Sequence, residues 1–149
     1  MKKSILIIAA FAAAAFTVRA ATPEQEKAFT DGYRKALEAG DAKTLASFLL
    51  TDGASAETVE FFKMMQALEP GAKITSLELV KIEAEDAKKF EEEMTMPDGK
   101  KYKLPVKPSK ILVIKTETKT ADGSSSDQSQ IPVAEKGGKI IIPIPVPVK

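Results

Sequence analysis

The chain has 149 residues, of which 44% are hydrophobic and 29% are charged, and its formal net charge is +1. It contains neither His nor Cys, which excludes imidazole-activated nucleophiles, zinc sites built from nitrogen and sulfur ligands, and disulfides. The near-neutral charge argues against a nucleic-acid-binding protein that neutralises phosphates. Only carboxylates, Lys, Tyr and hydroxyl groups remain for acid, base or nucleophile roles, and no cofactor is indicated.

Residues 1–20 have the pattern of a cleavable secretory signal peptide. A short basic start precedes an apolar run over residues 5–16, which is too short for a transmembrane helix because such a helix needs about 20 residues. Val18 and Ala20 are small or apolar, as signal peptidase requires, so we expect cleavage between Ala20 and Ala21. The sequence therefore predicts export to the periplasm or the extracellular space, with no membrane insertion after cleavage.

The expected mature chain, residues 21–149, has the length of one domain. It keeps all 21 acidic residues and loses three of the 22 basic ones, so its net charge is about −2. At this size folding buries roughly two thirds of the unfolded chain's surface, which is enough for a core without covalent cross-links.

Three amphipathic helices are predicted in the first half of this domain. The first begins at Thr22, which forms a capping-box pattern with Gln25, and it ends at Gly40. Its apolar stripe consists of Phe29, Tyr33, Ala36 and Leu37. Asp41 caps a short second helix, and Ser55 opens a third whose apolar arc is wide enough to meet protein on both sides. That arc comprises Val59, Phe61, Phe62, Met64, Met65 and Leu68.

After Pro70-Gly71 the apolar period changes from that of a helix to that of a strand. A first strand is predicted over residues 73–84, with a bulge or with burial on both faces. Residues 83–96 have the charges of a solvated helix, but their apolar residues alternate ahead of a turn at 97–99, which favours a hairpin. A helix at 85–93 is the alternative.

The clearest strand is predicted over residues 109–120. One of its faces carries Leu112, Ile114, Thr116, Thr118 and Thr120. The other face is partly charged, so we expect the first face to meet the helices. Turns at 122–123 and 137–138 lead into two further strands. The tail, residues 143–149, has a proline at every second position, which predicts an edge strand or a polyproline-like extension; a docking peptide is the functional alternative.

Three helices followed by five or six strands predict an α+β fold in which a curved, mostly antiparallel meander sheet wraps around the helices. This order resembles the nuclear transport factor two-like superfamily, which includes polyketide-cyclase-like and ketosteroid-isomerase-like enzymes. The resemblance rests on residues 29–37, on the step at 40–45 and on the hairpin at 133–140, and it implies a cone-like fold with a cavity. Ile140 replaces the family's usual aromatic residue, and the Asp and His groups of its enzymes have no counterpart, so the resemblance does not imply catalysis.

Two function classes remain open. We expect a non-catalytic module that binds a small apolar ligand or an envelope protein, because no catalytic motif is present; a homodimer is a further expectation. The alternative is an isomerase or cyclase that uses a cavity between helices and sheet, with Tyr33 as its candidate catalytic residue. A core aromatic residue with its hydroxyl at a polar rim is the simpler interpretation of Tyr33. The candidate cavity residues are Tyr33, Phe62, Met65, Thr116 and Thr118.

Overall fold

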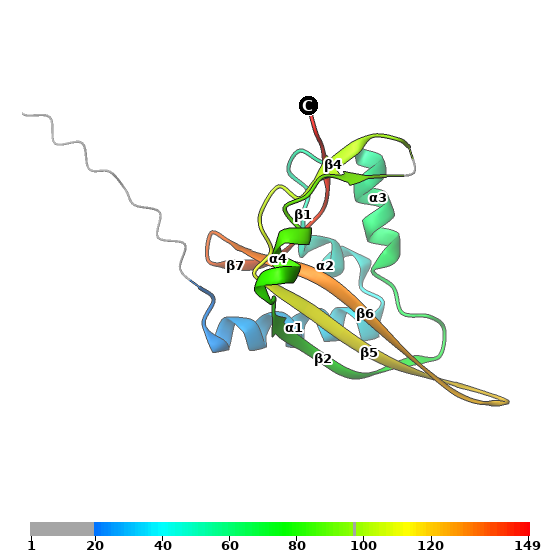
Figure 1. Ribbon diagram of the computed structural model, residues 1–149. Coiled ribbons are helices and arrows are strands. Elements are labelled where there is room, and N and C mark those ends of the chain that lie inside the picture. The colour runs from blue at the N-terminus through cyan, green and yellow to red at the C-terminus, as the bar shows by residue number, and fades with distance from the viewer. Residues whose placement is uncertain (1–19, 97) are drawn as a thin grey trace, which may run out of the picture.

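A computed structural model describes residues 20–96 and 98–149, and over these residues the protein has an α+β fold with four helices and two sheets (Figure 1). Residues 1–19 of the expected signal peptide lie outside this part of the chain. Ala20 and Ala21, which flank the expected cleavage site, immediately precede the first helix.

Helices occur at all three positions predicted in the first half. They are α1 (Pro23–Ala39), α2 (Ala42–Ser47) and α3 (Ala56–Met65). The Thr22 hydroxyl accepts from the Gln25 backbone N–H at 3.3 Å, and the Gln25 side chain accepts from the Thr22 N–H at 2.9 Å, which completes the capping box. Gly40 ends α1 at φ 61°, a backbone conformation that favours glycine.

The prediction of a hairpin over residues 83–96 is wrong in its first half. A fourth helix, α4 (Ala84–Lys89), occupies that half and buries no residue. Acidic residues in its first turn and lysines in its last turn stabilise it through the helix dipole, and this charge pattern outweighs the apolar alternation. The second half does form a short hairpin of β3 (Met94–Thr95) and β4 (Lys101–Lys103). Pro97 of its turn lies outside the described residues.

The main sheet has five strands and is mixed. In spatial order they are β1 (Leu49–Leu50), β7 (Lys139–Pro143), β6 (Gly123–Lys136), β5 (Lys110–Thr120) and β2 (Ala72–Lys81). All neighbouring pairs are antiparallel except β1 and β7, which are parallel. The strand β1 was not predicted, because two residues so close to the end of α2 carry no strand pattern. The expected bulge in the first long strand lies between Ile74 and Ser76.

The proline-rich tail forms part of the second sheet. Its strand β8 (Val146–Pro147) pairs with β4, so the spatial order is β3, β4, β8 and the tail ends as an edge strand. Ile144, just before β8, is fully buried in the main core. The tail is therefore integrated into the fold.

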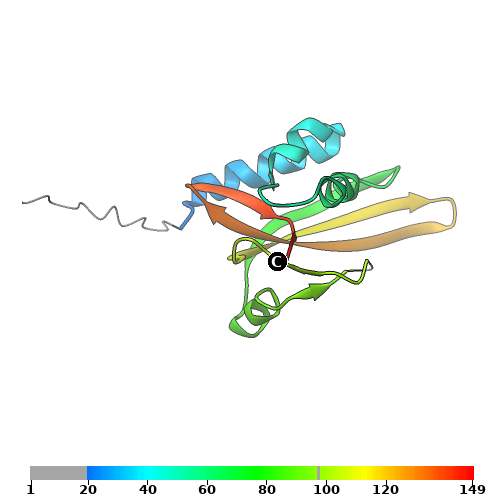
Figure 2. The same ribbon diagram turned by 90° about the horizontal axis from the view of Figure 1, so that it is seen from above.

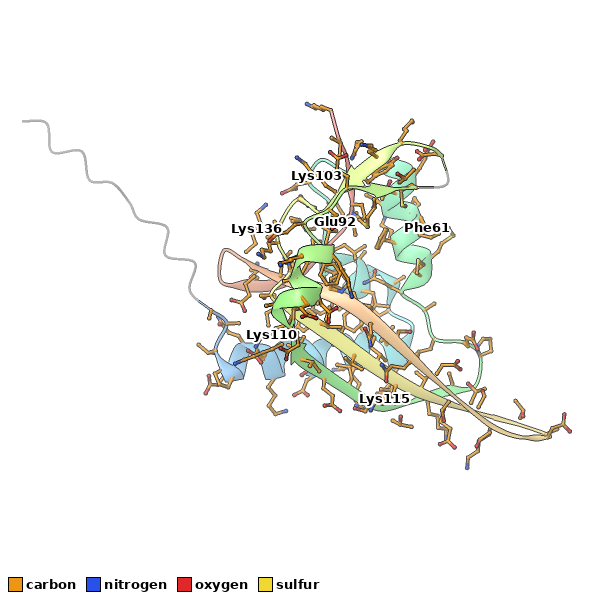
Figure 3. The ribbon with its side chains drawn as sticks, in the orientation of Figure 1. Phe61, Glu92, Lys103, Lys110, Lys115 and Lys136 are labelled. Atoms are coloured by element: carbon orange, nitrogen blue, oxygen red, sulfur yellow. The ribbon has the colours of Figure 1, made fainter. Side chains whose placement is uncertain are left out.

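The core lies between α1 and the main sheet. Figure 2 shows α1 on one side of this sheet, with α4 and the β3–β4 hairpin on the other. On the α1 side, the rings of Phe29, Tyr33 and Phe48 pack together with centroids 5.3–5.9 Å apart. Leu112 and Ile114 of β5 are buried in the same cluster, as the predicted orientation of that strand requires. Lys110 of β5 (labelled in Figure 3) adds an ion pair to Glu26 of α1.

Candidate functional site

A partly open pocket of about 580 Å³ lies on the α1 side of the main sheet. Its lining comes from α1, the end of α3, the segment that follows α3, and all five strands of the main sheet, with β6 contributing the most residues. Four of the five side chains expected to line a cavity are in its wall, namely Tyr33, Phe62, Met65 and Thr116. Thr118 is not among the lining residues.

Tyr33 is held in the pocket wall by its position on the apolar stripe of α1. It is completely buried, and its ring stacks on that of Phe29, one helical turn earlier. Gln66 lies directly after the last residue of α3 and is also buried. Its side-chain nitrogen Nε2 donates to the Tyr33 hydroxyl at 3.3 Å and to the backbone oxygen of Leu45 at 3.2 Å.

This polar pair keeps hydrogen-bonding capacity that the described part of the chain does not use. The Leu45 carbonyl can only accept, so the amide nitrogen of Gln66 must face it and the amide oxygen Oε1 must point elsewhere. Oε1 is buried and has no hydrogen-bond partner among the described residues. The Tyr33 hydroxyl already accepts from Gln66, and its own proton has no described acceptor. Two residues of the pocket lining, Tyr33 and Gln66, therefore hold one unused donor and one unused acceptor, both buried beneath the pocket surface.

Burial sets the protonation state of this pair. The pKa of Tyr33 is raised, chiefly because burial disfavours the phenolate, and the hydrogen bond from Gln66 opposes this only in part. Tyr33 therefore keeps its proton at neutral pH and acts as a hydrogen-bond donor. It is not suited to act as a base.

One wall of the pocket is the edge of β6, from residue 127 to residue 132. The β5–β6 hairpin closes with Thr120 opposite Gly123 across a two-residue turn, and the register is continuous from there to Val133. In such a hairpin the closing pair and every second pair after it exchange hydrogen bonds, so the odd-numbered residues of β6 bond to β5. The even-numbered residues direct their N–H and C=O groups to the opposite side, where β7 lies.

The β6–β7 ladder covers only the C-terminal end of that side of β6. It pairs residues 134–136 of β6 with residues 139–141 of β7. The next bonded pair in this register would be Pro132 with Pro143, and neither proline has an N–H to donate. The ladder ends there, and the chain continues instead to β8. The backbone groups of residues 124–132, which we call the open edge, are left without a neighbouring strand in the described structure.

The charged side chains that line the pocket are all acidic. Glu69 and Asp127 are the charged residues in its lining, which contains no Lys or Arg although the chain has 22. Both carboxylates are exposed, and neither forms an ion pair within residues 20–96 and 98–149. The mouth of the pocket is therefore acidic.

Part of the exposed surface of α3 is apolar, and its Met65 lines the pocket. Phe61, Met64 and Met65 are 46%, 71% and 65% exposed, and Phe61 lies on the outer surface of the helix (Figure 3). This wide arc was expected to lie in the core, whereas part of it faces solvent. It also missed Gln66, whose polar side chain directly after Met64-Met65 was the available signal.

The described residues bring no three acidic side chains together as a metal site would require. Within the same part of the chain, no helix has both the length and the apolar character needed to cross a membrane. Compared with protein-family models, with curated proteins and with solved structures, the chain matches none.

Proposed function

We propose that this chain is an exported, non-catalytic binding module whose pocket takes a ligand with one hydrogen-bond donor and one acceptor on a largely apolar body. The observation that carries the proposal is the buried pair of Gln66 and Tyr33 in the pocket lining, whose unused acceptor and donor a ligand would reach by displacing the side chains that cover them. The proposal of export rests on the signal pattern of residues 1–20. Membership of the nuclear transport factor two-like superfamily stays a proposal based on the order of helices and strands.

The free acceptor gives the binding a physical reason. A buried polar group without a partner costs about 1–3 kcal/mol, and that cost disappears when a ligand donates to it. The surrounding wall contains Leu37, Phe62 and Leu68, which would bury apolar ligand surface at roughly 25 cal/mol per Å². Most natural ligand sites likewise combine an apolar lining with a few convergent polar groups.

The enzyme alternative has less support. Its mechanism needs a base in a dry cavity, and the raised pKa of Tyr33 keeps that side chain protonated. The buried polar residues among those described are Thr58 and Gln66, so no buried carboxylate stands beside Tyr33. Glu69 and Asp127, the carboxylates in the lining, are exposed to water.

A titration with acetanilide tests the proposal, because its amide offers one donor and one acceptor on an apolar ring. We expect acetanilide to shift the side-chain amide resonance of Gln66 in ¹⁵N NMR spectra, and toluene, which lacks both groups, to leave it unshifted. Tyr33→Phe keeps the ring and removes the donor, so acetanilide binding should weaken about tenfold, the equivalent of 1.4 kcal/mol. Tyr102→Phe is the matched control because Tyr102 lies outside the lining.

Native mass spectrometry of the exported protein gives an independent reading, since it reports any molecule that stays bound through purification. A retained mass that Tyr33→Phe releases and Tyr102→Phe keeps would support the site. If acetanilide leaves Gln66 unaffected, or binds equally well to the Tyr33→Phe variant, the proposed site is wrong.

A further inference from the structure

We propose that the natural occupant of this pocket is an extended segment of a partner protein, which adds as a strand to the open edge of β6. The segment would carry apolar side chains at alternate positions and a Lys or Arg near one end. This inference rests on the proposed binding function and names the class of ligand.

The backbone of the open edge favours a polypeptide over other ligands. In the pocket wall, Gln128 and Gln130 each direct one N–H and one C=O away from β5, and Pro132 directs a C=O. These groups are spaced as in any β-ladder, so an added strand can satisfy them in one register, as in known cases of strand addition. A small molecule could meet few of them at the same time.

The open edge also lacks the protection usual for edge strands. Proteins block exposed edges with lysines, bulges or prolines. The outer strand at the far side of the sheet, β2, follows this rule, since it carries Lys73 and Lys81 and a bulge after Ile74. By contrast, residues 124–131 of the open edge contain no Lys and no Pro and their register is unbroken, and Pro132 stands at the end of the edge that adjoins β7. The edge therefore offers outward N–H and C=O groups from residue 124 to residue 130 and a C=O alone at Pro132.

The side chains around the edge indicate the chemistry of the segment. Alternate residues of an added strand point to one face of the sheet, and on the α1 side Phe62 and Met65 line the pocket and can receive apolar groups. Glu69 and Asp127 make the mouth acidic, which favours a basic residue at one end of the segment.

The same charge argues against a second copy as the occupant. Pairing two open edges around a twofold axis would bring two acidic mouths together, each with Glu69 and Asp127 and with no basic residue in the lining. Like charges across an interface are unfavourable. A basic segment from a different protein has complementary charge.

The experiment selects displayed peptides of about nine residues, a length that covers the edge, on the purified exported protein. We expect enriched sequences with alternating apolar residues and a terminal Lys or Arg. N-methylation of a selected peptide should abolish binding at the backbone positions that face β6 and should be tolerated at those between them, because only the former donate to the edge.

Two proline variants provide the matched pair on the protein. Gln130→Pro removes an outward N–H in the pocket wall and leaves the β5 ladder intact, so it should weaken binding at least tenfold. Ser126→Pro makes the same change at an outward position of the edge beyond the pocket wall and should weaken binding less than Gln130→Pro does, because the segment loses one hydrogen bond there and no contact with the pocket. Hydrogen exchange at the amides of Gln128 and Gln130 should slow in the wild-type protein when peptide is added.

Three outcomes would overturn the inference. The first is that selection enriches no peptide; the second is that selected peptides tolerate N-methylation at every position and therefore bind without forming a strand. In either case a shift of Gln66 by acetanilide would leave the proposed function standing. The third is a homodimer in native mass spectra that Gln130→Pro dissociates, which would make a second copy the occupant of the edge.

Discussion

The two ends of the β5–β6 hairpin share one continuous ladder and differ in burial, since the fully buried residues lie at one end only. At the packed end, residues 110–114 and 129–136, Leu112 is 0% and Val133 1% exposed. At the bare end, residues 115–128, every β6 residue from 123 to 128 is exposed, and the hairpin extends beyond the rest of the molecule (Figure 1). Backbone pairing therefore contributes most of the stability of the bare end, whereas the packed end also gains from the hydrophobic effect.

The contrast shows how a fold can stabilise a strand while leaving its edge available. The apolar residues of the packed end pack against α1, and at this end β6 also pairs with β7. Further along, the prolines at 132 and 143 end that pairing. The open edge is thus anchored at one end by the core and exposed along the rest of its length.

The largest expected effect is at the packed end. Leu112→Ala should lower the free energy of unfolding by about 2–5 kcal/mol, because the core would lose apolar contact and retain part of the cavity. Thr118→Ala lies on the same face of the same strand toward the bare end, and it should change stability by less than about 0.5 kcal/mol. Urea unfolding of both variants measures the difference, and equal losses would refute the distinction between the two ends.

Ile144→Ala extends the test to the tail that leaves the sheet after Pro143. Ile144 is completely buried, so the cost should lie in the lower part of the range of about 2–5 kcal/mol, since a segment near the chain end can relax toward the cavity. Val146→Ala, two residues on and half-buried, is the control and should cost less. A negligible cost for Ile144→Ala would mean that the tail is not part of the core in solution.

The stability of the protein at alkaline pH tests whether water is excluded from the core at the packed end. The folded pKa of Tyr33 is raised by burial, so its stabilising effect is fully present below the unfolded pKa of about 10 and is lost as pH rises through the folded pKa. Tyr33→Phe should therefore flatten the decline in stability above that pH. The pKa of Tyr102 is also raised, through its hydrogen bond to Asp98, but the partner is on the surface, so Tyr102→Phe should flatten the decline less.

Local signals predicted the helical half of the fold well. The Thr22 capping box, the Asp41 cap and Gly40 each act within a few residues of the helix end they define. The long strand at 110–120 was equally accessible, because its apolar alternation is local. The segment at 84–89 was predicted incorrectly because its helix depends on charge placement, whereas the prediction followed its apolar residues.

Features that depend on distant residues could not be predicted. The parallel pairing of β1 with β7 joins Leu49 to Ile142, and no local pattern in either segment identifies the other. The open edge likewise requires the β6–β7 register, since only this register places Pro132 opposite Pro143. Four residues that line the pocket could be named from the sequence because each lies on the patterned face of a helix or strand, whereas Gln66 depends on contacts with Tyr33 and Leu45.

The smallest expected change in stability concerns Ala21, the first residue of the expected mature chain, and its contact with the packed end. The backbone nitrogen of Ala21 donates to the Glu135 carboxylate at 2.7 Å, and cleavage after Ala20 would turn this nitrogen into an ammonium group. The hydrogen bond would then become a salt bridge, which is worth about 0.5–1 kcal/mol in a partly exposed position. We therefore expect Glu135→Gln to destabilise the cleaved protein by about that amount, and more at low salt.

Asp127→Asn is the matched control, because it removes the same charge from the same strand at the bare end, where Asp127 has no described ion-pair partner. It should leave stability unchanged within about 0.3 kcal/mol. The uncleaved chain gives a second comparison, since its Ala21 nitrogen is an uncharged amide and Glu135→Gln should cost it less. Equal effects of Glu135→Gln in both forms would mean that cleavage adds no salt bridge. Cleavage of the signal peptide would then not stabilise the packed end.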